Sequence, residues 1–122
     1  MRQCEKQMIK AARNYKPWKG RNTRVETMLG SVHVYFYNTR IAILDEGRYI
    51  TVTDGGWRRD VTKSRINALL QLTWTDKGMP HIFKKDGVWY LKGLDNSIVE
   101  WKGNASLPLS DTKGWWSDDG RE

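Results

Sequence analysis

The sequence predicts a single α+β domain. Two segments carry apolar residues at the helical spacings of three and four, and short apolar runs separated by turn residues lie between and after them. The 122 residues fit one compact domain, because two domains of half that size would each bury too little apolar surface. We expect residues 1–106 to form it in the order N-terminal helix, antiparallel meander of three to four strands, second helix and C-terminal hairpin.

The first helix is predicted over residues 2–14, and Pro17 and Gly20 end it and begin a loop. Its apolar residues share one face. Basic residues at the same spacing form a stripe on another face, where neighbouring like charges repel one another unless an anion is bound. The apolar face holds Cys4, Met8, Ala11, Ala12 and Tyr15, and the basic stripe holds Arg2, Lys6, Lys10 and Arg13.

Four short strands are predicted next, at residues 23–29, 32–37, 41–44 and 49–53. The connections between them are two to four residues long, which favours an antiparallel meander. In the second strand, Val and Phe alternate with His and Tyr, so that strand has two different faces.

A second helix follows, with Thr62 as its predicted N-cap and Asp60 near the positive end of the helix dipole. Ile66, Leu69 and Leu70 recur at helical spacing and are expected to face the sheet.

The dipeptide Asp86-Gly87 predicts a hairpin turn between strands at residues 81–85 and 88–92, and a further short strand is predicted at 98–102. From residue 107 the chain mixes Pro, Ser, Asp and Gly with Trp115-Trp116, so we expect residues 107–122 to be a loosely ordered acidic tail rich in Trp. Because Trp often anchors protein interfaces, this tail is also a candidate segment for docking on a partner protein.

The formal net charge of +7 is concentrated in two parts of the chain. Residues 1–24 hold eight basic groups and one acidic group, and residues 57–85 hold seven basic groups and two acidic groups. Such blocks favour a polyanionic partner such as DNA or RNA, although a role in solubility alone stays open.

Several protein classes are excluded or disfavoured by composition. The single cysteine excludes an internal disulfide framework and a cysteine-rich zinc site. No apolar run approaches the roughly 18 residues that cross a membrane, and the chain does not open like a secretory signal peptide.

A family pattern that runs GNT-V, then GW, then TTKSRLNALL is matched by residues 20–25, 34–43, 55–58, 61–70, 82–85 and 89–91. With these segments the chain resembles a family of small proteins of tailed bacteriophages. The resemblance covers about residues 18–92 and implies a phage-encoded protein in the cytoplasm of the infected bacterium. It implies no activity and therefore no catalytic residue.

The candidate nucleic-acid site lies around the start of the second predicted helix. Arginine and lysine side chains and a helix N-terminus can hold phosphates, and an indole ring can stack on a base. The alternative that Trp57 covers the edge of the core, and that the basic residues form a solvated face, stays open. The expected contacts are Trp57, Arg58, Arg59, Lys63 and Arg65, then Lys84 and Lys85 beside Trp89-Tyr90, with the N-terminal helix stripe Arg2, Lys6, Lys10 and Arg13 as an extension.

Signs of catalysis are few. His33 and His81 are the only histidines and have no companion cysteines, so we expect no metal and no cofactor. A magnesium-dependent nuclease built on Asp95, Glu100 and Lys102 is kept only as a control hypothesis. We expect a non-enzymatic protein that binds nucleic acid, or alternatively a protein-binding inhibitor of a host or anti-phage defence factor. The oligomeric state is left open.

Overall fold

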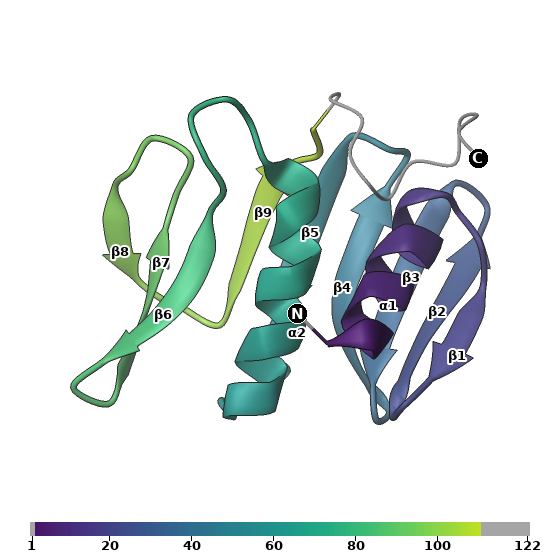
Figure 1. The fold of residues 1–122 in the computed structure, drawn as a ribbon, viewed down its shortest axis with the longest axis horizontal. Coiled ribbons are helices and arrows are strands. Elements are labelled where there is room, and N and C mark those ends of the chain that lie inside the picture. Colours follow the sequence, from purple (N-terminus) through teal and green to yellow (C-terminus); the bar gives the residue numbers. More distant parts are fainter. Residues whose placement is uncertain (1, 111–122) are drawn as a thin grey trace.

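The computed structural model describes residues 2–110, which form two helices, a short 3-10 helix and nine strands in two antiparallel sheets (Figure 1). The predicted α+β class is confirmed, with more strands than the sequence indicated. In chain order the elements are α1 (Gln3–Arg13), β1 (Trp18–Gly20), β2 (Thr23–Met28), β3 (Ser31–Phe36), β4 (Thr39–Asp45), β5 (Tyr49–Thr53), α2 (Asp60–Leu70), η1 (Gln71–Thr73), β6 (His81–Lys85), β7 (Val88–Lys92), β8 (Ile98–Glu100) and β9 (Asn104–Pro108).

The larger sheet has the strand order β1-β2-β3-β4-β5-β9. The first five strands form an antiparallel meander, because short turns join neighbouring strands. Strands β2 to β5 correspond to the four predicted strands, and β1 is an additional strand at the edge. The sixth strand, β9, comes from the far end of the described chain and pairs with β5, Leu107 opposite Ile50.

The expected start of a loose tail at residue 107 is therefore wrong for residues 107–110. Leu107 and Pro108 lie in β9, and Leu109 and Ser110 are 7% and 8% exposed. Hydrogen bonds from the backbone N–H of Leu109 to Arg48 and of Ser110 to Leu72 hold this segment in place. The predicted docking segment with Trp115-Trp116 lies outside the described residues.

Both helices lie on the same face of the large sheet (Figure 1). The alternation predicted along β3 is confirmed, since Val32, Val34 and Phe36 are buried and the residues between them are partly exposed. Apolar residues of α1 and α2, among them Met8 and Leu69, complete the core, which is what an amphipathic helix on a sheet provides.

The second helix begins earlier than Thr62. Arg59 has extended backbone angles and is the N-cap residue, so the helix starts at Asp60. Thr62 therefore lies inside the first turn, and its side chain is buried instead of capping the helix.

The smaller sheet, β6-β7-β8, lies beside α2 (Figure 1). The predicted hairpin turn is confirmed, with positive φ angles at Asp86 and Gly87. The side-chain amide of Asn67 on α2 exchanges two hydrogen bonds with the backbone of Ile82, at 2.7 and 2.9 Å. This pair fixes β6 against the helix.

Candidate nucleic-acid interface

The loop between β5 and α2 is held by the buried carboxylate of Asp54. This carboxylate accepts hydrogen bonds from the backbone N–H of Gly56 at 2.8 Å, from the indole Nε1 of Trp101 at 2.8 Å and from Nε of Arg58 at 3.2 Å. Asp54 is 5% exposed, so its charge is compensated by these donors and not by water. The loop therefore has a fixed shape, and it carries Trp57 with its side chain 56% exposed.

Gly55 allows the loop to lie against the start of β4. Its φ is +61°, in the region that favours glycine, and a Cβ at this position would overlap the methyl Cγ2 of Thr39. The Gly-Gly dipeptide of the sequence thus brings Trp57 next to the turn between β3 and β4.

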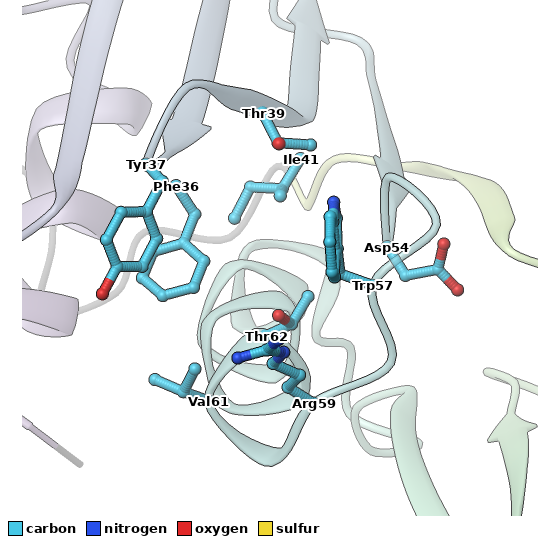
Figure 2. A pocket seen from close by; sticks show the side chains of 9 residues that line it. All are labelled: Phe36, Tyr37, Thr39, Ile41, Asp54, Trp57, Arg59, Val61 and Thr62. Atoms are coloured by element: carbon cyan, nitrogen blue, oxygen red, sulfur yellow. The ribbon is translucent and has the colours of Figure 1, made fainter.

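A groove of about 370 Å³ lies between this loop and that turn. Figure 2 shows the indole ring of Trp57 edge-on, with Ile41, Phe36 and Tyr37 on one side of it and Asp54 on the other. One face of the ring therefore looks into the groove. The lining residues are Phe36, Tyr37, Thr39, Ile41, Asp54, Trp57, Arg59, Val61 and Thr62.

A β-bulge brings Ile41 into this lining. Val34 pairs with Ala42 and Tyr35 pairs with Arg40, so Ile41 is the extra residue between two paired positions. Bulges bend a strand and re-aim a side chain, and they are frequent beside functional sites.

Tyr37 closes the groove opposite Trp57. It follows β3 with a positive φ of 58°, and its side chain is 61% exposed. Its ring packs edge-on against Phe36 at 4.8 Å, and its hydroxyl accepts a hydrogen bond from Asn22 at 3.1 Å. Sequence reasoning assigned no binding role to Tyr37 or Phe36; the available signal was a pair of aromatics directly before a turn.

Two of the cationic side chains predicted for this site are Arg59, which lines the groove, and Lys63, which lies near it on α2. The guanidinium of Arg59 lies 5.3 Å from the centre of the Trp57 ring, and no carboxylate of residues 2–110 pairs with it. Lys63 lies on the first turns of α2, with its ammonium 4.0 Å from the carboxylate of Asp60.

The smaller sheet contributes a third cation. Lys84 of β6 reaches the same carboxylate oxygen of Asp60, also at 4.0 Å. The structure therefore brings Lys84 to the start of α2, whereas Lys85, its exposed neighbour at the end of β6, forms no ion pair with any carboxylate of residues 2–110.

Arg58 has a structural role in addition to its charge. Besides the bond to Asp54, its Nη2 donates to the backbone carbonyl of Trp101 at 3.2 Å. Its side chain is 44% exposed. The phosphate contact of Arg58 stays a prediction, and two of its nitrogens already hold the loop.

Arg65 does not belong to the interface, and this expectation is corrected. Its side chain is 3% exposed, and its Nη1 lies 2.8 Å from the carboxylate of Glu5. Nε donates to the hydroxyl of Thr23 at 3.2 Å, and the guanidinium lies over the ring of Phe36 at 5.2 Å. A group enclosed between α1, α2 and β2 cannot reach a phosphate at the surface.

The basic stripe of α1 remains at the surface but approaches α2 at one end only. Arg2, Lys6 and Lys10 are exposed, and Arg13 is half-buried with Nη2 donating to the carbonyl of Ser110 at 3.3 Å. Arg2 lies 3.8 Å from Glu5, the residue that pairs with α2. Lys10 and Arg13 lie toward the other end of the helix.

In the nuclease hypothesis Asp95 and Glu100 would hold the metal, and Asp95 is engaged within its own turn. Asp95 lies in the turn between β7 and β8, where it accepts hydrogen bonds from the hydroxyl and the backbone N–H of Ser97 at 2.6 and 3.0 Å. These bonds lower the pKa of Asp95, the hydroxyl contributing most. Nowhere in residues 2–110 do three His, Cys, Asp or Glu side chains gather as metal ligands would.

Comparison with known protein families gives one match over most of the chain. The family described as Kyanoviridae Gp96 protein matches residues 1–108. The chain belongs to this family. Its resemblance to a bacteriophage protein family is thereby confirmed, over a longer stretch than residues 18–92.

The other comparisons add no relative. None of the curated proteins and none of the solved structures matches the chain. Among the described helices, none has the length and apolar character needed to span a bilayer.

Proposed function

We propose that this phage protein binds nucleic acid, without catalysing a reaction on it, through the surface around the start of α2. One observation carries the proposal: an exposed Trp57 faces an apolar groove whose rim holds Arg59, which pairs with no carboxylate of residues 2–110. Exposed aromatic rings next to cations are the combination that single strands of nucleic acid use, by stacking and by phosphate contact. The setting we propose is the cytoplasm of the infected bacterium.

The charges near the groove support a phosphate-binding rim. Arg59, Lys63 and Lys84 lie around the first turn of α2, near the exposed carboxylate of Asp60. The N-cap residue of α2 offers no side-chain acceptor, so the first N–H groups of the helix are available to bind an anion. Arg2 and Lys6 would extend this rim along α1 for a longer strand.

Stacking and charge have separate experimental signatures. Stacking of one base on an aromatic ring contributes about 1–3 kcal/mol and depends little on salt. Each phosphate contact steepens the slope of log affinity against log salt concentration, by about 0.7 for a single strand and about 0.9 for duplex DNA. A nucleic-acid site here is therefore expected to show both terms.

Titration of the purified protein with labelled DNA and RNA oligonucleotides, at several salt concentrations, tests the proposal. The double variant Arg59→Ala/Lys63→Ala is expected to lower the salt slope by about one to two. The matched control is Arg48→Ala/Lys77→Ala, which removes two exposed charges near the other end of α2. Equal slopes for wild type and the first variant, or no binding at about 50 mM salt, would contradict the proposal.

A second candidate is a protein-binding inhibitor of a host or defence factor. The observation that favours it is an exposed apolar pair on the edge strand β8, where Ile98 and Val99 are 57% and 55% exposed. This function predicts a host protein that stays bound after nuclease treatment and is lost with Ile98→Lys. A partner lost on nuclease treatment alone would count for nucleic-acid binding instead.

A further inference from the structure

We propose that the groove beside Trp57 holds one unpaired nucleobase, so that the protein selects single-stranded over duplex nucleic acid. This inference rests on the proposed nucleic-acid binding and names the class of strand. It is carried by the shape of the groove, by the face of the Trp57 ring that looks into it, and by two hydroxyl groups that form no hydrogen bond within residues 2–110.

The groove offers a flat ring one stacking surface and apolar walls. One face of Trp57 looks into it, while Phe36, Ile41 and Val61 surround the space on the other sides (Figure 2). Its volume of about 370 Å³ lies at the small end of ligand pockets. In a duplex both faces of a base are covered by its neighbours, so only an unpaired base can present a face to the indole.

A buried hydroxyl in the lining points to a polar edge on the occupant. Thr62 is 2% exposed, lines the groove, and forms no hydrogen bond with any of residues 2–110. Buried polar groups are nearly always paired, so an unpaired one directed at a groove indicates a ligand atom. Figure 2 shows this side chain rising from α2 toward the groove.

Thr39 provides a second hydroxyl on the opposite wall, likewise without a hydrogen bond in the described chain. A hydroxyl both donates and accepts, and the edge of a nucleobase carries both donors and acceptors. A purely apolar occupant would leave both hydroxyl groups unsatisfied. The lining therefore fits a base better than an aromatic side chain of a partner protein.

The rim supplies the contacts for the attached phosphate. Arg59 is exposed, and it can turn from the Trp57 ring toward a phosphate when a base takes the ring face. Lys63 lies one turn further along α2. The carboxylate of Asp54 does not oppose this, because it lies behind Trp57 and is bonded to Arg58 and Trp101 (Figure 2).

The test compares one oligonucleotide as a single strand, the same sequence as a duplex, and a mononucleotide, each titrated against the full chain. The variants are Trp57→Ala and Thr62→Val, and the matched control is Tyr49→Ala, which removes another exposed aromatic, 55% exposed, on β5. Thr62→Val keeps the branched shape and removes only the hydroxyl. Circular dichroism of each variant checks that it is folded.

We expect the single strand to bind at least about tenfold more tightly than the duplex. Trp57→Ala should weaken single-strand binding roughly five- to 150-fold, which is the range of one stacking contact. Thr62→Val should weaken it several-fold and leave duplex binding unchanged. Tyr49→Ala should change neither.

Other outcomes overturn the inference in distinguishable ways. If single strand and duplex bind equally, and binding depends on Arg59 and Lys63 but not on Trp57, the groove does not hold a base. The proposed nucleic-acid binding would then still be supported. A mononucleotide that binds as tightly as the oligonucleotide identifies a free nucleotide as the ligand and overturns strand selection. If no oligonucleotide and no mononucleotide binds, both the single-strand inference and the proposed nucleic-acid binding are wrong. The same holds if no nucleotide binds and a host protein is captured only when Trp57 is present.

Discussion

Glu5 of α1 and Arg65 of α2 form an ion pair of 2.8 Å in which both side chains are 3% exposed. The carboxylate also accepts a hydrogen bond from the hydroxyl of Ser64 at 2.6 Å, and the guanidinium donates to Thr23 of β2. Three elements thus meet at one charged pair inside an otherwise apolar core. This contact joins α2 to α1 and to β2.

The first prediction concerns the stability of this pair. Glu5→Ala or Arg65→Ala leaves one buried charge without its buried ion-pair partner, and each should lower the free energy of unfolding by about 3–5 kcal/mol. The double variant Glu5→Leu/Arg65→Met removes both charges and should lie closer to wild type. Urea denaturation followed by circular dichroism measures these values. Arg2→Ala, which removes an exposed partner of the same carboxylate, should cost less than about 1 kcal/mol.

The second prediction concerns Asp54 as the anchor of the Trp57 loop. Asp54→Ala leaves the buried indole N–H of Trp101 without an acceptor, which costs about 1–3 kcal/mol of stability. The variant also removes a negative charge beside the groove. A purely electrostatic effect would therefore raise nucleic-acid affinity, whereas loss of the loop shape should lower it. We expect lower affinity in an oligonucleotide titration at fixed salt, and an increase would show that the loop does not need this anchor.

The third prediction separates backbone strain from steric overlap with Thr39 at the dipeptide Gly55-Gly56. At Gly55 an added Cβ would overlap the methyl of Thr39, and the φ of +61° is also unfavourable for alanine. At Gly56 the φ of +87° is unfavourable, but the space around an added Cβ is open. Gly56→Ala should cost about 1–2 kcal/mol, and Gly55→Ala should cost more. Adding Thr39→Ser to Gly55→Ala removes the overlapping methyl and should recover part of the difference in thermal unfolding. Equal losses for the two glycines would mean that the contact with β4 is unimportant.

The helices and most strands could be predicted because their signals are local. Apolar spacing located α1 and α2, and alternation located β3 with its buried face. The edge strands β1 and β9 were missed for a physical reason. β1 has three residues, too few to show a period, and β9 is specified by its partner β5, which lies about 50 residues earlier.

In the candidate site, too, local features could be predicted from the sequence and features that depend on distant segments could not. Trp57 and Arg59 could be proposed from sequence because an aromatic and a cation directly before a helix are neighbours in the chain. The burial of Arg65 could not, because its partner Glu5 lies 60 residues away and any cation on a helix looks exposed until the opposite wall is known. The groove was missed because a bulge and a turn in another part of the chain form its far side.

A fourth prediction concerns the turn that holds Asp95. Because the hydrogen bonds from Ser97 stabilise the charged carboxylate, Ser97→Ala should raise the pKa of Asp95 toward its ordinary value of 3.8. A lowered pKa means that the stabilisation is present above the ordinary value and is lost as the pH falls through the pKa of the folded protein. A carbon-detected NMR titration of wild type and variant measures both values. A wild-type pKa at or above 3.8 would contradict the assigned cause.

The last prediction concerns Asp60, which competes with any phosphate for Lys63 and Lys84. Its carboxylate lies 4.0 Å from both ammonium groups and its side chain is 82% exposed. Asp60→Asn should therefore raise the affinity for oligonucleotides and steepen its dependence on salt, by up to about 0.9 in slope for each additional phosphate engaged. The change should cost only about 0.3–1 kcal/mol of stability, since a first-turn carboxylate interacts favourably with the helix dipole.

The matched control is Asp76→Asn, an identical charge change at an exposed position in the loop after η1. If only net charge matters, the two variants should gain affinity equally. A larger gain for Asp60→Asn than for Asp76→Asn would locate phosphate binding at the start of α2. Equal gains would move the polyanion site elsewhere on the surface, with the exposed stripe of α1 as the next region to test.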